Sequence, residues 1–388
     1  METKLSKDAG NKTWKPAPNK TGSTYSCPWT DWVSPNPLGA SSWSIGWKSF
    51  TAMGKWLLDK RPTIPRTQEL DRRLPILPID FHTVLQPTDG VRVTWIGHAT
   101  SLVQFDGINL LTDPMFSERA APTQVMGPPR YRLVPPNLWN LLNTPEMKIH
   151  AVLISHNHYD HLDSDSVIEL NSRFPEAWWF VPEGLDCWFK EKGCKNTKEM
   201  TWWQEQELPT HRHIKMAFTP AQHWCQRLST GVNHVLWGSW AVIGPKHRFF
   251  FAGDTGYCDV FKSIGEEYGP FDVATIPIGC YEPRWYMCPQ HVNPEEAVKI
   301  HMDIRAKQSV AIHWGTFNLS NEEYDQPVKD LHEARAKKLA DATSFIVLKH
   351  GQTKTFPSGA SGRNPYLLLA AHKPTEDKQI PRRMEAHL

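Results

Sequence analysis

The chain has 388 residues, which is enough for one large domain with extensions or for two domains, so its hydrophobic core can be sizeable. Its formal net charge of +2 provides no overall field that would favour a nucleic-acid partner. No window approaches the roughly 18 apolar residues of a membrane-spanning helix, and residues 1–8 lack the apolar stretch of a signal peptide, so we expect neither element.

Cysteine and tryptophan usage adds two expectations. The seven cysteines are odd in number and include no CxxC pair, which indicates a reducing, intracellular compartment rather than a disulfide framework. Tryptophan occurs 18 times, and it favours interfaces where one side is apolar and the other is wet.

Residues 1 to about 40 are rich in Pro, Ser, Asn and Lys, and we expect them to be disordered or loosely draped. Within them, Pro28–Trp32 is an apolar island that would need a surface to rest on. A helix candidate follows, with a serine N-cap at 41 or 42 and with Trp43, Trp47 and Phe50 on one side.

The first 66 residues contain ten Lys or Arg against four Asp or Glu. Basic charge beside tryptophan is typical of an interfacial segment that binds a membrane surface. Alternatively, these aromatic side chains cover the core or form the contact of a homodimer. Both alternatives stay open.

From residue 91 the sequence becomes dense in strands, and helical patterns fall between them. Strands are predicted at 91–96, 101–105, 108–112, 150–154, 178–181, 213–219, 235–243, 248–252, 272–278, 308–312 and 344–349. Helices are predicted at 164–173, 183–192, 294–304 and 326–340. Two groups of strands with helices between them predict an α/β fold in which two sheets pack face to face with helices outside, an αββα sandwich.

Three imidazoles and a carboxylate lie within six residues, directly after the apolar run 151–154. In an extended loop, His156 and His158 point the same way and can bind one metal ion. The side chains of Asp160 and His161 would point to the opposite side of the loop and can bind a second ion. Imidazole with carboxylate is a ligand mixture that suits zinc and its borderline neighbours.

Three further candidates, His223, Asp254 and His313, each follow a short apolar strand, where a rigid scaffold presents functional groups. Taken singly, each is as well explained by a structural hydrogen bond or a turn. The ordered set HxHxDH, His, Asp, His resembles the ligand pattern of the metallo-β-lactamase superfamily in type and order.

Seven ligands divide between two zinc ions. His156, His158 and His223 would hold the first ion, Asp160, His161 and His313 the second, and Asp254 would bridge them. Two such ions share a hydroxide whose pKa falls toward about 7, and this hydroxide can attack carbon or phosphorus. His98, Asp113 and Asp163 are candidates for orienting the imidazoles, although ordinary turn and cap roles are equally open.

Longer strings resemble the N-acylphosphatidylethanolamine-hydrolysing phospholipase D family over roughly residues 70–350. The segments that carry this resemblance are Leu153–Asp163, Pro220–Cys225, Trp237–Trp240, Phe249–Cys258, Ile278–Trp285 and Ala311–Phe317. The resemblance implies a membrane-associated zinc phosphodiesterase that releases N-acylethanolamine and phosphatidic acid, peripheral on an internal membrane.

The resemblance also implies that Tyr159 and His291 contact the substrate near the metals. His291 could protonate the leaving alkoxide, beside the catalytic carboxylates Asp160 and Asp254. One departure concerns Val125, which stands after Gln124 where the family has an aromatic residue, so the shape of the lipid groove is expected to differ.

Two other functions would be compatible with a fold of this kind. A lactonase or RNA-processing hydrolase would share the fold, but the catalytic region has no long basic run and carries many aromatics. A non-catalytic scaffold would be expected to have lost ligands, whereas all seven are present. We accordingly divide the chain into an N-terminal extension (1–66), a metallo-β-lactamase-like catalytic domain (67–356) and a flexible tail (357–388).

Overall fold

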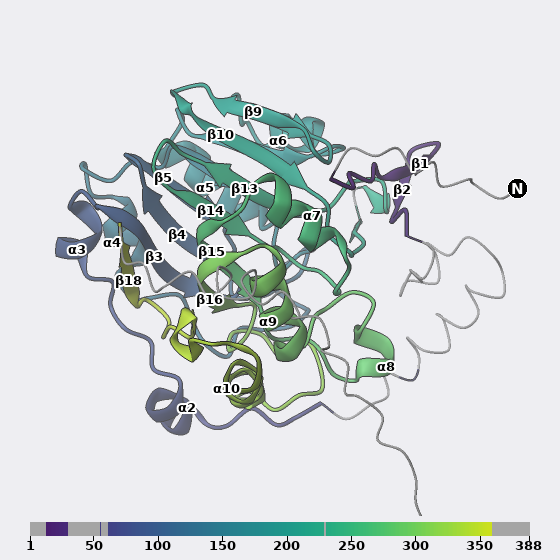
Figure 1. Cartoon of the computed structure of the whole chain (residues 1–388). Coiled ribbons are helices and arrows are strands. Elements are labelled where there is room, and N and C mark those ends of the chain that lie inside the picture. Colours follow the sequence, from purple (N-terminus) through teal and green to yellow (C-terminus); the bar gives the residue numbers. More distant parts are fainter. Residues whose placement is uncertain (1–12, 30–54, 56–60, 229, 359–388) are drawn as a thin grey trace, which may run out of the picture. The chain divides into compact units, whose positions relative to one another are not determined.

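The structure is a computed structural model that describes residues 13–29, 55, 61–228 and 230–358. Its helices are α2 (Thr67–Arg73), α3 (Phe81–Leu85), α4 (Leu138–Leu142), α5 (Ser164–Arg173), α6 (Asp186–Glu191), α7 (Val260–Glu267), α8 (Arg284–Met287), α9 (Pro294–Asp303) and α10 (Gln326–Lys338), with the 3-10 helix η2 (Ala342–Ser344) (Figure 1).

The strands of the described residues fall into two large sheets and two hairpins. They are β1 (Asn19–Thr21), β2 (Thr24–Ser26), β3 (Gly90–Gly97), β4 (Thr100–Phe105), β5 (Ile108–Thr112), β6 (Ala151–Leu153), β7 (Trp178–Pro182), β8 (Thr197–Met200), β9 (Glu205–Leu208), β10 (His211–Thr219), β11 (Gln226–Arg227), β12 (Gly231–Val232), β13 (Ser239–Ile243), β14 (Arg248–Phe251), β15 (Phe271–Pro277), β16 (Ala306–Ile312), β17 (Phe345–Ile346) and β18 (Thr353–Pro357).

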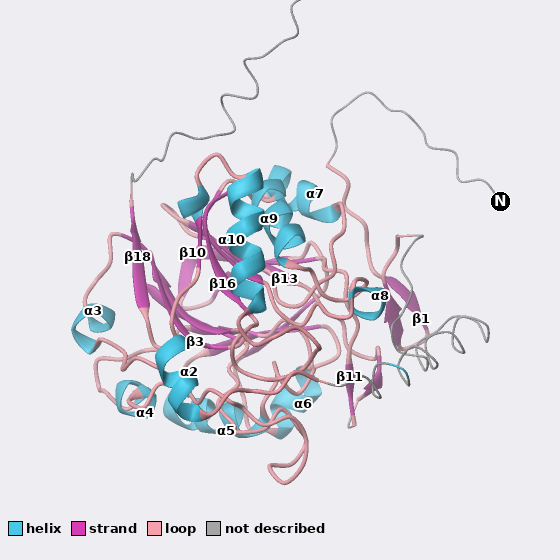
Figure 2. Ribbon diagram, turned by 90° about the horizontal axis from the view of Figure 1, so that it is seen from below, coloured by secondary structure: helices cyan, strands magenta, loops and turns pink. Residues whose placement is uncertain are grey.

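Each large sheet is mixed. The first has the order β18-β3-β4-β5-β6-β7-β8 and is antiparallel as far as β5 and parallel from there on. The second has the order β17-β16-β15-β14-β13-β10-β9, parallel from β17 to β14 and antiparallel beyond. Helices α7, α9 and α10 cover one outer face and α4, α5 and α6 the other (Figure 2). The predicted αββα sandwich is confirmed.

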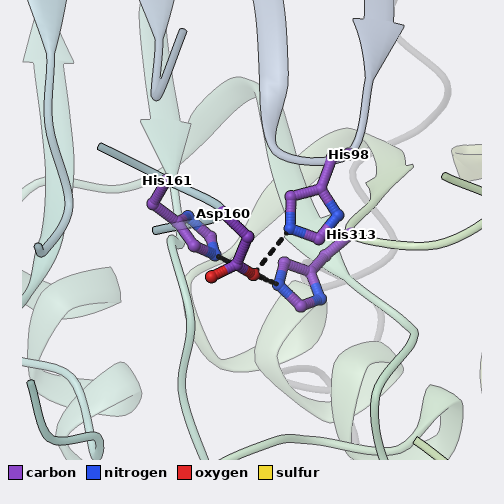
Figure 3. A group of neighbouring side chains, drawn as sticks. All are labelled: His98, Asp160, His161 and His313. Carbon is purple, nitrogen blue, oxygen red and sulfur yellow. Dashed lines mark hydrogen bonds and ion pairs between the residues drawn. The ribbon is translucent and has the colours of Figure 1, made fainter. Parts of the chain in front are cut away.

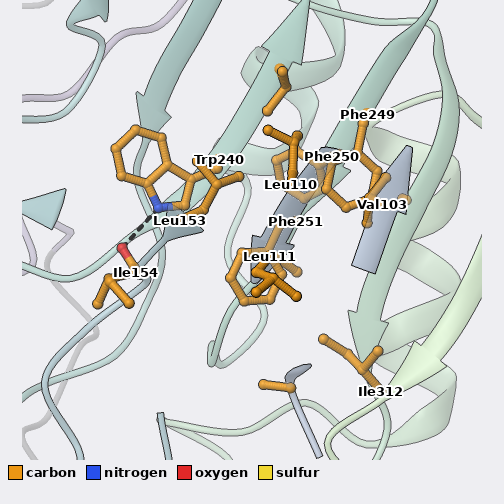
Figure 4. Close-up of a cluster of buried hydrophobic side chains, with 14 of the residues drawn as sticks. Val103, Leu110, Leu111, Leu153, Ile154, Trp240, Phe249, Phe250, Phe251 and Ile312 are labelled. Carbon is orange, nitrogen blue, oxygen red and sulfur yellow. Dashed lines mark hydrogen bonds between the residues drawn. The ribbon is translucent and has the colours of Figure 1, made fainter. Parts of the chain in front are cut away.

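The core lies between the two sheets and is built from fully buried aliphatic and aromatic side chains (Figure 4). Strand β14 contributes three consecutive phenylalanines, 249 to 251, all 0% exposed, because a strand covered on both faces needs no polar side. Trp240 of β13 donates its indole N–H to the carbonyl of Ile154 at 2.8 Å, which links the second sheet to the chain leaving β6.

The directions of the strands bring several strand ends to one edge of each sheet. Strands β3, β5 and β6 run the same way in the first sheet, as the pairings through β4 require. Strands β10, β14, β15 and β16 share a direction in the second sheet. Their carboxyl ends therefore deliver loops to a common edge within each sheet.

Most predicted elements are observed, with two instructive differences. Helix α5 has the predicted bounds, whereas the prediction of a strand from 235 was wrong, because β13 begins only at Ser239. Helix α7 was missed, and its Gly265 lowers the helical signal of the sequence. A Cβ at Gly265 would lie 2.0 Å from the carbonyl oxygen of Asp303, so the glycine permits close packing against α9.

The expectation of a disordered or loosely draped N-terminal segment is wrong for residues 19–26, which form the hairpin of β1 and β2. Nearby, Trp29 stacks on Trp202 with ring centroids 6.0 Å apart and planes 3° from parallel. The apolar island therefore begins on the surface of the sandwich. The helix candidate with Trp43, Trp47 and Phe50 lies outside the described residues, as does the chain beyond 358.

Across the described residues, none of the helices has the length and apolar character needed to cross a bilayer.

Candidate metal centre

Four strand ends supply the seven predicted ligands. The HxHxDH loop leaves β6, His223 lies beyond β10, Asp254 beyond β14 and His313 directly after β16. His313 adopts a left-handed backbone conformation with φ 59°, which turns the chain sharply out of its strand. Its N–H donates to the carbonyl of His98 at 2.9 Å, so the two sheets meet at this corner.

The first predicted group of ligands is brought together. Nε2 of His156 lies 2.9 Å from Nδ1 of His158, which lies 3.2 Å from Nε2 of His223. Two ligands at about 2.05 Å from one tetrahedral zinc ion lie about 3.3 Å apart. The three ring nitrogens are thus spaced as ligands of one small cation.

The second predicted group is also brought together, with His98 as an additional member (Figure 3). The carboxylate of Asp160 lies among the three imidazoles, with Oδ2 2.8 Å from Nε2 of His98, 3.3 Å from that of His161 and 3.4 Å from that of His313. Nε2 of His161 and Nε2 of His313 are 3.1 Å apart. His98 thereby contacts a predicted ligand, as an orienting residue would.

Asp254 lies between the two groups. Its Oδ2 is 3.1 Å from Nε2 of His161 and its Oδ1 is 3.1 Å from Nε2 of His313. The same Oδ2 lies 3.9 Å from His156 and 3.8 Å from His223 on the other side. This is the position that a carboxylate bridging two cations would take.

Electrostatics distinguish the two groups. Burial lowers the pKa values of His156 and His223 well below their usual range, and it lowers the pKa of His158 to about 4. These three imidazoles are therefore neutral at physiological pH, which is the protonation state that binds metals.

The carboxylates dominate the other group. Burial acts to lower the pKa of His161, but Asp254 and Asp160 outweigh it and hold that pKa well above its usual range. The pKa of His313 is raised to about 9, against burial, chiefly by Asp254. Negative charge is thus concentrated where the second cation was predicted.

Hydrogen bonds behind the ligands fix their orientation. Asp113 accepts from Nδ1 of His161 at 2.6 Å and from the backbone N–H of Ser155 at 2.7 Å. The carbonyl of Gln290 accepts from Nδ1 of His223 at 2.9 Å, which leaves Nε2 free to bind a metal. Asp163 instead caps α5 by accepting a hydrogen bond from the backbone N–H of Ser166, which is an ordinary helix-capping role.

The two residues implied in substrate contact occupy different surroundings. Nδ1 of His291 lies 3.8 Å from Oδ2 of Asp254, and its ring lies 5.2 Å from that of His223. Tyr159 accepts a hydrogen bond from the backbone N–H of Leu228 at 3.2 Å, and its ring faces Arg227. His291 therefore lies inside the cluster, whereas Tyr159 lies beside the ligand loop.

The donor set suits metal ions on geometric grounds. In one group, Nδ1 of His158 lies within 3.2 Å of ring nitrogens of both His156 and His223, where only a proton or a cation between the nitrogens relieves the repulsion of their lone pairs. Oδ1 of Asp254 is fully buried, and among the described residues it faces Nε2 of His313 at 3.1 Å. Such an oxygen is costly unless a cation satisfies it.

Sequence reasoning missed two residues that support the cluster. Gln290 acts through its backbone carbonyl, for which no sequence pattern exists, although it directly precedes His291. Arg227 contacts the ligand loop from β11, a strand of two residues that carries no periodic signal.

Comparison with known proteins identifies the family of this chain. A model of the Beta-lactamase superfamily domain matches residues 108–314. The N-acyl-phosphatidylethanolamine-hydrolyzing phospholipase D 1 of Caenorhabditis elegans is 42% identical over 334 residues, which cover 82% of this chain and 90% of that protein. The chain belongs to this phospholipase D family.

Two further relatives extend the comparison. The mitochondrial N-acyl-phosphatidylethanolamine-hydrolyzing phospholipase D of Saccharomyces cerevisiae is 36% identical over 242 residues, covering 61% of this chain and 50% of the yeast protein. An isothiocyanate hydrolase from Delia radicum gut bacteria shares the fold with a TM-score of 0.53 and 18% identity, covering 69% of this chain and 99% of its own. That likeness supports the metallo-β-lactamase-type sandwich alone.

Proposed function

We propose that this protein is a metal-dependent phospholipase D that hydrolyses N-acylphosphatidylethanolamine to N-acylethanolamine and phosphatidic acid. The observation that carries the proposal is the arrangement of seven predicted ligands in two groups around Asp254. It occurs in a chain that aligns with 90% of a phospholipase D named for this substrate.

Two zinc ions would be held by the side chains described above, His156, His158 and His223 on one side and Asp160, His161 and His313 on the other, with Asp254 shared. Bound cations of this kind supply positive charge for a phosphoryl oxygen and lower the pKa of water toward about 7.

The protein's own residues have separate tasks in this proposal. His291, beside Asp254, would donate a proton to the oxygen of the departing N-acylethanolamine. Tyr159 would contact the lipid from the edge of the ligand loop. Val125, 81% exposed in the loop before Arg130, would give the lipid groove a smaller wall than an aromatic residue would.

The bond that breaks distinguishes a phosphodiesterase from a lyase or an acyl hydrolase. Water attacks phosphorus, the P–O bond on the ethanolamine side breaks, and the proton goes to the alcohol.

Hydrolysis in heavy-oxygen water should therefore label phosphatidic acid and leave N-acylethanolamine unlabelled. The reaction should be run with N-acylphosphatidylethanolamine and, in parallel, with plain phosphatidylethanolamine. Label in the alcohol, or no product from the N-acylated lipid, would refute the proposal.

We also propose that the protein works as a peripheral enzyme on an internal membrane, in line with the mitochondrial yeast relative. The basic, tryptophan-rich segment before residue 67 would bind the lipid surface, with up to about 1 kcal/mol from each cation near an anionic leaflet. A triple alanine variant of Trp43, Trp47 and Phe50 should sediment weakly with vesicles while its melting temperature stays unchanged. Normal sedimentation with a lower melting temperature would assign these side chains to the core.

A further inference from the structure

A buried arginine, Arg227, lies against the ligand loop. Arg227 of β11 is 6% exposed and follows the predicted ligand His223 by four positions. Its guanidinium carbon lies 4.3 Å from the ring centre of Tyr159 and 5.2 Å from that of Trp188 in α6. The group is therefore enclosed between two aromatic rings.

The hydrogen bonds of Arg227 go to the ligand loop itself. Nη1 donates to the carbonyl of Leu162 at 2.7 Å and to the carbonyl of Asn157 at 3.3 Å. Asn157 stands between His156 and His158, and Leu162 directly follows His161. One nitrogen thus holds both ends of the segment that contributes ligands to both groups.

Among the described residues, Arg227 forms no ion pair with a carboxylate. Other arginines, such as Arg132 and Arg284, do form one. Burial lowers the pKa of Arg227 from its usual range, with Tyr159 and Asp163 acting in the opposite direction. A buried guanidinium is costly unless its N–H groups are bonded, so these two carbonyls are its main compensation.

Two other contacts tie the same hairpin to the same loop. The side chain of Asn157 donates to Oγ1 of Thr230 at 2.8 Å. The backbone N–H of Leu228 donates to the hydroxyl of Tyr159 at 3.2 Å. The β11–β12 hairpin therefore backs the loop at three points, and Arg227 supplies the charged one.

We propose that Arg227 is a positioning residue that fixes the spacing between the two ligand groups by holding the carbonyls of Asn157 and Leu162. The inference rests on the proposed metal-dependent function. Fixing both carbonyls on one planar group sets the distance between His156 and His158 on one side and Asp160 and His161 on the other. A lysine keeps the charge but not the rigid guanidinium geometry.

The chain offers a matched control at the far end of β14. Nη1 of Arg248 also donates to two backbone carbonyls, those of Tyr268 at 2.7 Å and Gly269 at 3.1 Å. Arg248 begins the strand whose other end leads to Asp254, so it makes the same kind of bond away from the ligands. Arg248→Met should reproduce any general cost of losing such an arginine.

The test measures metal retention without lipid. Zinc-loaded wild type, Arg227→Met, Arg227→Lys and Arg248→Met are dialysed against a chelator, and zinc per chain is followed by elemental analysis together with the melting temperature. Arg227→Met should hold zinc about 10- to 100-fold more weakly, the range found when groups that orient ligands are removed. Arg227→Lys should fall between it and wild type, and Arg248→Met should retain zinc normally.

Zinc retention by the variants decides whether Arg227 positions the ligand loop. Retention of zinc by Arg227→Met at the wild-type level overturns the inference, and so does equal loss from Arg248→Met. If Arg227→Met does not fold, the lysine variant decides, because wild-type retention by it leaves no need for the guanidinium. If the wild type fails to hydrolyse N-acylphosphatidylethanolamine while Arg227→Met still loses zinc, the proposed substrate is wrong and the positioning role stands.

Discussion

At the scale of single residues, the centre depends on side chains whose roles differ although their types repeat. Histidines 156, 158 and 223 converge as neutral rings, while His161 and His313 face carboxylates. Three residues of this centre, His98, Asp113 and His313, have left-handed backbone conformations, with φ of 53°, 32° and 59°. Strained conformations of this kind cost about 1–3 kcal/mol each and mark sites where function sets the geometry.

Asp254→Asn should remove metal from the protein and abolish activity with the fold largely intact. The substitution removes the anion that lies between both groups, whereas the sheets rather than the metals supply the core. Elemental analysis and thermal unfolding check both statements. Asp259→Asn, which removes an exposed carboxylate paired with Lys262, serves as the control and should change neither. Wild-type metal content in Asp254→Asn would exclude the bridging role.

His291→Ala should lower turnover by about 10²–10⁴ while metal content stays unchanged, because a proton donor is lost but no predicted ligand. His291 lies 3.8 Å from Asp254, close enough to serve the reacting group. Turnover of N-acylphosphatidylethanolamine and zinc per chain are measured side by side, with the exposed His234→Ala as control. A loss smaller than tenfold would reduce His291 to a bystander.

At the scale of elements, packing corrects what local patterns indicate. Helix α9 is clear in the sequence because Asn293 and Glu296 form a capping box and Pro294 stands at the first helical position. Helix α7 is not predicted from the sequence, because Gly265 weakens its helical pattern. The same glycine allows α7 to pack closely against α9. The hairpin of β1 and β2 carries few apolar residues of its own, and it is ordered through contacts with segments far along the chain, such as the hydrogen bond from Tyr25 N–H to the carbonyl of Asn233 at 2.8 Å.

Trp29→Ala should destabilise the protein by about 1–3 kcal/mol, because it removes a half-buried ring stacked on Trp202. Urea unfolding monitored by circular dichroism gives the free energy of unfolding. Trp14→Ala is the matched control, since Trp14 is 50% exposed and belongs to the same segment, and its effect should be clearly smaller. Equal effects of the two substitutions would show that the hairpin does not depend on the Trp29–Trp202 stack.

At the scale of the whole molecule, stability should fall in acid through histidines that are buried away from the metal centre. His301 of α9 is hydrogen-bonded to Ser309 at 2.8 Å, and burial lowers its pKa to about 4. Burial likewise lowers the pKa of His350 to about 3. Below a pH of about 6.5 the unfolded chain binds protons at these sites and the folded protein does not, so unfolding is favoured as the pH falls.

His301→Gln should therefore flatten the acid side of the stability curve. Above a pH of about 6.5 both states are neutral at this site and it contributes no slope. Between about 6.5 and about 4 each unit of acidification costs up to about 1.4 kcal/mol at one such histidine. The difference in free energy of unfolding between variant and wild type, followed by urea titration at several pH values, isolates this contribution because both carry the same ligand set. A difference independent of pH would contradict the assignment.

The sequence by itself determined the local features of this protein. The HxHxDH motif, the later His, Asp and His, and the short apolar strands before them carry the candidate ligands and predict the sandwich, because ligand type and strand period are properties of neighbouring residues. Resemblance in these same strings indicated the family. The role of Asp254 followed from that order and the role of His291 from the resemblance, and neither followed from any visible geometry.

Only the tertiary structure decided which groups meet. Four contacts join segments that are far apart in the sequence. They are the addition of His98 to the second group, the hydrogen bond of the Gln290 carbonyl to His223, the packing of residues 13–29 on the sandwich and the hydrogen bonds of Arg227 to the ligand loop. Such contacts depend on the directions and pairings of strands, and they use backbone carbonyls that every residue carries. No local pattern records them, and for that reason they emerge only when the two sheets are packed together.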